Sequence, residues 1–320
     1  MPSILDILWK NLGSLLQLFG IVQFATDFTN VQYLNDQNEM LYGHLALPSN
    51  YDANATTPYP LALVFHAWNG MADEPVYFAD LLANDAGYVA FAPDLFRGVR
   101  AQSALFPWNI FTVSVTPQDR MDADIDTALA YLEENYNVDV SNVVSGPGFC
   151  FGGSQALELS KRRNTRATVT LYGASISELQ DPTAEESVWG LLGAEDAPIL
   201  GIYGADDMAP SPEDVRGFEE ALEARGAIYN ITIYDGVGHA FVNPEAHQSG
   251  DEPAVQAWDQ VMEFMTSLTE GSLSDTKWQR RRDVQIVKTT PYRPSRSWLW
   301  DHMMDYQYHK GHANPHQGAN

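Results

Sequence analysis

Cysteine is nearly missing from this sequence, which has a single one, Cys150, in 320 residues. One cysteine cannot form a disulfide within the chain, so the small secreted folds that depend on disulfides are excluded. A structural zinc site built from several thiolates is excluded for the same reason. Cys150 is therefore either a packed apolar side chain or a reactive thiol, and its sequence context has to decide between the two.

Basic residues are also scarce, since 18 Lys and Arg stand against 42 Asp and Glu, which gives a formal net charge of −24. A surface this acidic repels nucleic acids and anionic lipids. We therefore expect no nucleic-acid partner, and no membrane partner, for the main part of the chain.

A long uninterrupted apolar run is absent as well. The segment 3–24 is rich in Leu, Ile and Phe, but Asp6, Lys10 and Gln17 interrupt it. A membrane-spanning helix needs about 18 apolar residues in a row, and a secretory signal needs a basic start before a cleaner apolar core. We expect residues 1–28 to form an amphipathic helix, and the protein to be cytoplasmic, with secretion or an organelle left open.

The last fifty residues differ from the rest. Residues 271–320 hold eight Lys or Arg and four Asp or Glu, so this tail carries +4 and residues 1–270 carry −28. A basic tail on an acidic body is expected to wrap that body or a neighbouring copy, and a homodimer through the N-terminal helix or the tail is one possibility. The four histidines after residue 300 are irregularly spaced, so we expect no metal site there.

Buried strands and helices alternate through the middle of the chain. Two short strands at 31–34 and 40–48 read as an edge hairpin. Apolar runs typical of buried strands lie at 61–66, 88–93, 142–147, 167–172, 199–203 and 228–234, and helices are expected at 74–85, 117–136, 154–163, 212–225 and 252–268. This order predicts an α/β fold over residues 29–270, a doubly wound and mostly parallel sheet with active groups at the carboxyl ends of the strands.

Cys150 lies at the centre of a glycine-rich turn between a strand and a helix. Residues 148–153 read Gly-Phe-Cys-Phe-Gly-Gly. A nucleophile elbow has this arrangement, because the central residue needs a strained backbone and the flanking positions have no room for side chains. The helix N-terminus beneath it favours a thiolate. The alternative is a buried structural cysteine, since free cysteines are often buried.

Two other strand ends supply the groups that a nucleophilic thiol needs. His239 lies in a glycine-rich loop after the strand 228–234, and the adjacent Asp206 and Asp207 follow the strand 199–203. Nucleophile, acid and base occur in the chain order of an α/β-hydrolase triad. His239 would take the proton of Cys150 and return one to the leaving group, while one of the aspartates orients the imidazole.

An ester or lactone carbonyl attacked by a thiol develops a negative oxygen that needs hydrogen-bond donors. The backbone N–H of Phe151, directly after the nucleophile, is one candidate donor for this oxyanion hole. The loop after the first buried strand supplies the other, for which we select Trp68.

Four segments carry a resemblance to a known family. They are 66–70 (His-Ala-Trp-Asn-Gly), 87–95 (Gly-Tyr-Val-Ala-Phe-Ala-Pro-Asp-Leu), 148–153 and 238–241 (Gly-His-Ala-Phe). Together they resemble the dienelactone hydrolase family of α/β-hydrolases, over roughly residues 31–268. The resemblance implies hydrolysis of a lactone or small ester through a thioester, by a Cys, Asp and His triad without cofactor or metal.

The same resemblance favours Asp207 over Asp206 as the acid. Two departures from the family pattern affect the expected substrate and reactivity. Ala67 stands where the family commonly has an acid that helps to activate the thiol, so activation by His239 alone is implied. Asn243 stands where well-studied members have a carboxylate-binding arginine, so a neutral ester is the expected substrate.

Four residues are expected to contact that substrate, namely His66, Trp68, Arg97 and Trp108. For His66 the alternative is a structural role at the strand end. The alternative function for the whole chain is a catalytically weak relative that binds a ligand or partner.

Overall fold

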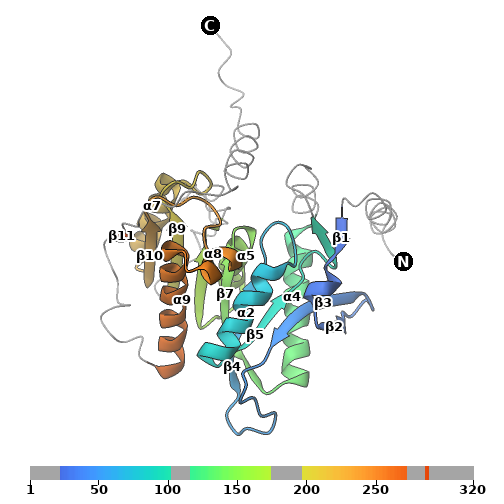
Figure 1. Ribbon diagram of the computed structural model, residues 1–320. Helices are drawn as coiled ribbons and strands as arrows, with labels where there is room; N and C mark the ends of the chain where they lie inside the picture. The colour runs from blue at the N-terminus through green and yellow to red at the C-terminus, as the bar shows by residue number, and fades with distance from the viewer. Residues whose placement is uncertain (1–21, 102–115, 174–196, 272–284, 288–320) are drawn as a thin grey trace.

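The computed structural model describes residues 22–101, 116–173, 197–271 and 285–287. Within these ranges one nine-stranded sheet runs through the molecule in the order β11-β10-β9-β8-β7-β4-β5-β3-β2 (Figure 1). Its strands are β2 (Val31–Leu34), β3 (Met40–Ala46), β4 (Tyr59–Phe65), β5 (Val89–Pro93), β7 (Val138–Phe149), β8 (Ala167–Leu171), β9 (Ile199–Gly204), β10 (Tyr229–Tyr234) and β11 (Gln285–Val287). All neighbours from β11 to β5 pair in parallel.

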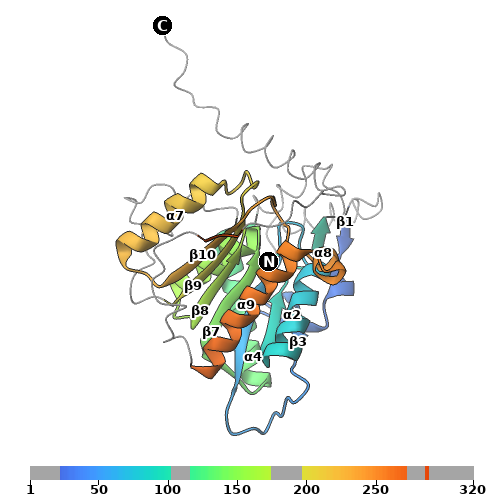
Figure 2. The ribbon, with the colours of Figure 1, turned by 60° about the vertical axis from the view of Figure 1, so that its left-hand side comes forward.

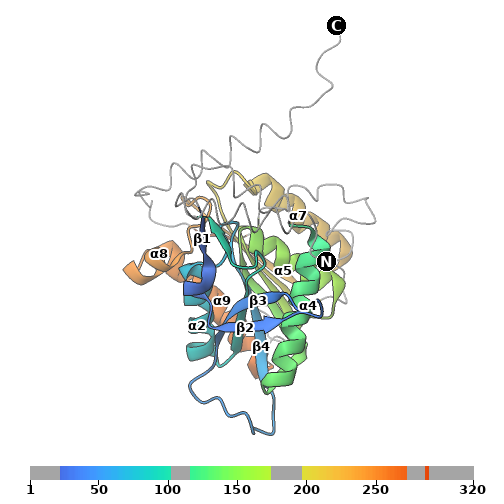
Figure 3. The ribbon, with the colours of Figure 1, turned by 90° about the vertical axis from the view of Figure 1, so that its right-hand side faces the viewer.

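The hairpin of β2 and β3 is antiparallel and forms one edge of the sheet, as predicted. Six helices are described, and they connect or follow the parallel strands. They are α2 (Asp73–Ala86), α4 (Gln118–Asn135), α5 (Phe151–Arg162), α7 (Pro212–Arg225), α8 (Pro244–Ser249) and α9 (Glu252–Glu270). Seen from the β2 edge, α2, α8 and α9 lie on one side of the sheet and α4, α5 and α7 on the other (Figure 3). The predicted doubly wound α/β fold is confirmed.

Both faces of the sheet are buried, because the strands present apolar side chains on either side. Along β4, Ala62 and Val64 join the core that contains Phe78 of α2. Leu61 and Leu63 join the core that contains Ile125 of α4. Alternate residues of a strand point to opposite faces, so a continuous apolar run is what a strand covered on both sides requires. Figure 2 shows α9 and α2 lying across one such face.

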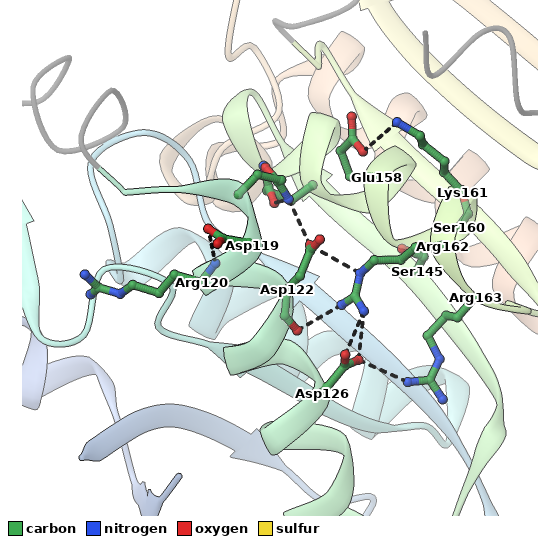
Figure 4. A network of polar contacts seen from close by, with 12 residues as sticks. Asp119, Arg120, Asp122, Asp126, Ser145, Glu158, Ser160, Lys161, Arg162 and Arg163 are labelled. Atoms are coloured by element: carbon green, nitrogen blue, oxygen red, sulfur yellow. Dashed lines mark hydrogen bonds and ion pairs between the residues drawn. The ribbon is translucent and has the colours of Figure 1, made fainter. Parts of the chain in front are cut away.

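Helices α4 and α5 are held together by a polar network (Figure 4). Arg162 near the end of α5 donates from one nitrogen to both carboxylate oxygens of Asp126 at 2.9 Å and pairs with Asp122 at 3.2 Å. Gln118 and Gln155 exchange two hydrogen bonds of 2.9 and 3.0 Å. The network fixes α5 against α4, and α5 is the helix that follows Cys150.

The prediction of a helix over residues 1–28 is wrong for its C-terminal end. Val22–Phe24 forms strand β1, which pairs antiparallel with β6 (Val99–Ala101), and Ala25–Phe28 forms a 3-10 turn. Backbone pairing with a distant strand has overridden the local helical pattern. Residues 1–21 lie outside the described ranges. Helix α8, the small sheet of β1 and β6, and strand β11 were also not predicted. None of the helices in the described ranges is both long and apolar enough to cross a membrane.

Strand β11 brings part of the basic tail onto the body, where it pairs in parallel with β10 and covers that strand's outer edge. We predict that a chain ending at residue 271 melts about 4 °C lower than one ending at residue 287, because the shorter chain loses ladder hydrogen bonds of about 1 kcal/mol each. Calorimetry on the two truncated chains measures the difference. Equal melting temperatures would show that β11 contributes nothing to stability.

Candidate active site

Cys150 occupies the turn between β7 and α5 with a backbone conformation that L-residues rarely adopt, φ 55° and ψ −114°. Its N–H donates to the carbonyl of Leu171 at 3.0 Å, and its own carbonyl accepts from Gly153 at 2.9 Å. The residue is buried. Strain of this kind persists only where the surroundings hold it, and it is typical of functional turns.

The glycines around Cys150 are required by close backbone packing. A Cβ atom at Gly148 would collide with the carbonyl of Gly152, and a Cβ atom at Gly152 would collide with the carbonyls of Phe65 and His66. The elbow therefore lies directly against the carboxyl end of β4. This contact brings Cys150 next to the loop that contains Trp68.

The acid and the base of the predicted triad are in contact. Asp207 Oδ2 lies 2.8 Å from His239 Nδ1, and its Oδ1 accepts from the N–H of Ala209 at 2.9 Å. Asp207 is 5% exposed, whereas Asp206 is an exposed residue. The structure thus pairs His239 with Asp207 and leaves Asp206 at the surface.

The other nitrogen of the imidazole is directed to the thiol. Nε2 of His239 is buried and has no hydrogen-bond partner of regular geometry among the described residues, yet it lies within interaction range of Cys150. Burial by itself lowers the pKa of His239, but Asp207 and Cys150 raise it, and the outcome is a pKa well above the ordinary value. The imidazolium form of His239 is therefore favoured by its surroundings.

Tyr172 supports this pair and was not singled out from the sequence. Its ring lies edge-on to His239 with centroids 5.1 Å apart, and its hydroxyl donates to the carbonyl of Val242 at 2.8 Å. Its place at the carboxyl end of a predicted strand was the available signal.

The substrate contact predicted for His66 is contradicted by its hydrogen bonds. His66 is fully buried, its Nδ1 donates to the carbonyl of Ala67 at 2.7 Å, and its Nε2 accepts from the N–H of Leu95 at 3.1 Å. Burial lowers the pKa of His66 to about 4, so the ring is neutral. Both nitrogens are occupied, and His66 therefore ties two loops at the strand ends together.

The substrate contact predicted for Arg97 is wrong for a similar reason. Its Nε and one terminal nitrogen bind both carboxylate oxygens of Asp124 at 2.8 Å, and the other terminal nitrogen binds Glu39 at 2.7 Å. These carboxylates hold the pKa of Arg97 above its usual range despite burial. The guanidinium joins the β2–β3 hairpin to α4 and is not available to a ligand.

Four residues that were singled out from the sequence remain. Trp68 lies in the loop after β4, half-buried against both apolar cores. The side chain of Phe151 is buried and stacks on His66. Trp108 lies outside the described residues. Asn243, at the position of the family arginine, caps α8 by accepting from Ala246 at 3.0 Å.

A second acidic group reaches this site without having been predicted. Glu74, in the first turn of α2, interacts electrostatically with His239 and with Tyr172. Its position at the start of a helix after the loop 66–70 was the only signal in the sequence. Among the described residues, no group of three or more His, Cys, Asp or Glu is arranged to hold a metal ion.

A strained cysteine elbow, a buried Asp–His pair and a doubly wound sheet define the α/β-hydrolase class. The family model described as "Dienelactone hydrolase family" matches residues 45–269. The chain therefore belongs to the dienelactone hydrolase family, and it is a carboxylic ester or lactone hydrolase of that type, as predicted.

Similar proteins agree with this assignment. The chain is 28% identical over 241 residues to a Yersinia pestis protein named "Putative carboxymethylenebutenolidase", covering 72% of this chain and 85% of that one. It is 27% identical over 264 residues to an Escherichia coli K12 protein of the same name, covering 78% and 95%. A Klebsiella pneumoniae structure described as "Putative Dienelactone Hydrolase" superposes with a TM-score of 0.58 at 25% identity, over 73% of this chain and 98% of that one.

The backbone contact at the elbow gives a direct test. We predict that Gly152→Ala lowers the free energy of unfolding by about 3 kcal/mol, because its Cβ meets two backbone carbonyls that cannot move aside. Gly250→Ala is the matched control, since its φ is +76° but its Cβ meets nothing within 4 Å, and about 1 kcal/mol is expected there. Urea unfolding measures both, and equal losses would contradict the packing argument.

Proposed function

We propose that this protein hydrolyses small neutral carboxylic esters or lactones with Cys150 as nucleophile, His239 as base and Asp207 as its orienting acid. The observation that carries the proposal is the buried 2.8 Å contact between Asp207 and His239 Nδ1, which leaves Nε2 toward Cys150. The strained elbow that carries the thiol at the start of α5 supports the same assignment.

In the first half of the reaction the thiolate attacks the carbonyl carbon of the substrate. The carbonyl π electrons move to oxygen and give a tetrahedral oxyanion. The carbonyl then re-forms, the bond to the leaving oxygen breaks, and His239 Nε2 gives that oxygen its proton. An alcohol leaves, or the opened end of a lactone stays attached, and Cys150 holds the acyl group as a thioester.

Two backbone N–H groups are proposed to stabilise the oxyanion. Phe151 is the first residue of α5, and the first N–H groups of a helix have no acceptor within the helix. The loop of Trp68 follows β4, whose end packs against Gly152. Donors from these two places would meet over the carbonyl of a substrate held at Cys150.

In the second half of the reaction water cleaves the thioester. His239, now neutral, takes a proton from the water as its oxygen attacks, and the tetrahedral intermediate expels the sulfur of Cys150. The products are a carboxylic acid and the free thiolate paired with the imidazolium. Asp207 keeps Nδ1 protonated throughout and holds the ring in position.

A neutral substrate is favoured because the two positions at which a carboxylate-binding group would be expected are engaged in other interactions. The guanidinium of Arg97 is bound to Asp124 and Glu39, and Asn243 caps a helix. Neither offers a free positive charge to a substrate carboxylate.

We predict that Cys150→Ala abolishes hydrolysis of short p-nitrophenyl esters while the wild type turns them over, because the nucleophile is removed. The absorbance of the released p-nitrophenolate at 405 nm measures the rates of both proteins. Equal rates, or none in either protein, would contradict the proposal and favour the alternative of a ligand-binding relative.

Two adjacent aspartates supply the matched control. Asp207→Asn is expected to lower kcat/KM by roughly 10⁴-fold, because the amide no longer favours the required tautomer and charge of His239. Asp206→Asn removes the same charge one residue away, at the surface, and is expected to change kcat/KM less than about twofold.

A further inference from the structure

Glu74 is an acidic side chain of the described residues that interacts with His239 and that the proposed triad does not use. It lies in the first turn of α2 and is half-buried. None of the hydrogen bonds or ion pairs among the described residues involves its carboxyl group. A half-buried carboxyl without a partner is costly to ionise, so its charge state depends on what surrounds it.

The phase of α2 places Glu74 on the helix face that packs against the strand leading to the elbow. Phe78, four residues further on, lies on the same face of the helix and stacks on Phe149 with ring centroids 5.0 Å apart and planes at 24°. Phe149 is the residue directly before Cys150. Glu74 lies one helical turn before Phe78, and helical side chains lean toward the helix N-terminus. The carboxyl group of Glu74 therefore extends toward the carboxyl ends of the strands.

The groups that interact with Glu74 come from two loops as well as its own helix. His239 follows β10 and attracts the carboxylate, whereas Asp73 on α2 repels it. Tyr172, which follows β8, interacts with Glu74, Cys150 and Asp207 together. Farther along α2, His44 of β3 is paired with Asp80 at 2.9 Å, and His247 of α8 is bonded to Tyr77 at 2.8 Å, so neither is directed to Glu74.

Burial, followed by repulsion from Asp73, raises the pKa of Glu74 to about 8, although His239 opposes the shift. The carboxyl group is therefore mostly protonated at pH 7 and ionises as the pH rises through about 8. Below that pH the site beside Cys150 carries one negative charge fewer than above it.

Resting on the proposed function, we propose that Glu74 is a specificity-determining residue that selects ligands of Cys150 by charge. In its protonated form it admits neutral ligands and can donate a hydrogen bond to one. In its ionised form it places a carboxylate near the thiolate and repels a ligand that carries a carboxylate of its own. The preferred substrate class is accordingly the uncharged ester or lactone, with increasing discrimination against anionic esters above pH 8.

The test uses two alkylating reagents that differ in charge. Iodoacetamide is neutral and iodoacetate is anionic, and both alkylate the thiolate by displacement of iodide. Cys150 is the only cysteine in the chain, so the mass added to the full-length protein reports this thiol alone. Dividing the iodoacetamide rate by the iodoacetate rate cancels the ionisation of Cys150 itself.

We predict that this ratio rises at least about threefold between pH 6.5 and pH 9.5 in the wild type, the effect of one added charge nearby. The ratio in Glu74→Gln is expected to rise clearly less than in the wild type, because the amide fills the same space and never ionises, which leaves only the titration of His239. Asp73→Asn is the matched control, since it removes an exposed charge one residue away and should keep the rise. Titration of His239 is common to all three proteins and does not distinguish them.

A level ratio in the wild type, or an equal rise in Glu74→Gln, would overturn the proposal. A level wild-type ratio overturns the proposal whether or not the variant folds. The outcome is separate from the hydrolase assignment, because alkylation requires no ester turnover. If hydrolysis depends on Cys150 but the alkylation ratio stays level, only the role of Glu74 is refuted. If the ratio rises as predicted but no hydrolysis depends on Cys150, only the proposed function is refuted.

Discussion

The contact between the elbow and the end of β4 is the constraint on which the site depends. Gly152 touches the carbonyls of Phe65 and His66 so closely that no side chain fits between them. That contact fixes the turn of Cys150 in its strained conformation and sets the thiol at the start of α5. It also fixes the loop of Trp68 beside the elbow. The proposed nucleophile and the proposed oxyanion donors are thus positioned by backbone packing.

Electrostatics then sets what the positioned thiol can do. The protein is strongly acidic, but the charge state of the site depends on a few neighbouring groups. Asp207 is bonded to one side of the imidazole and raises the pKa of His239 against the effect of burial. Glu74, from α2, lies in an environment that raises its own pKa to about 8. One buried carboxylate thus favours the imidazolium at neutral pH, while the second carboxyl group stays neutral and does not repel a ligand.

The sequence allowed the elbow, the sheet and the Asp207–His239 pair to be predicted, because each leaves a local signal. Glycines at close contacts, apolar runs and strand-end loops are visible in a single chain. His66 and Arg97 were misassigned because their partners are distant in sequence: Leu95 for the first, Asp124 and Glu39 for the second. Glu74 was missed because its direction depends on how Phe78 packs on Phe149. Strand β11 could not be predicted because it has three residues and pairs with β10, which is distant in the sequence.

The central claim is that the reaction passes through an acyl group on Cys150. Its most direct test is to mix the protein with a short p-nitrophenyl ester, quench with acid within the first turnover, and map the acyl mass by peptide mass spectrometry. The account predicts a hydroxylamine-sensitive acyl group on the only cysteine-containing peptide. Release of p-nitrophenol with the acyl group on a different residue, or on none, would contradict it.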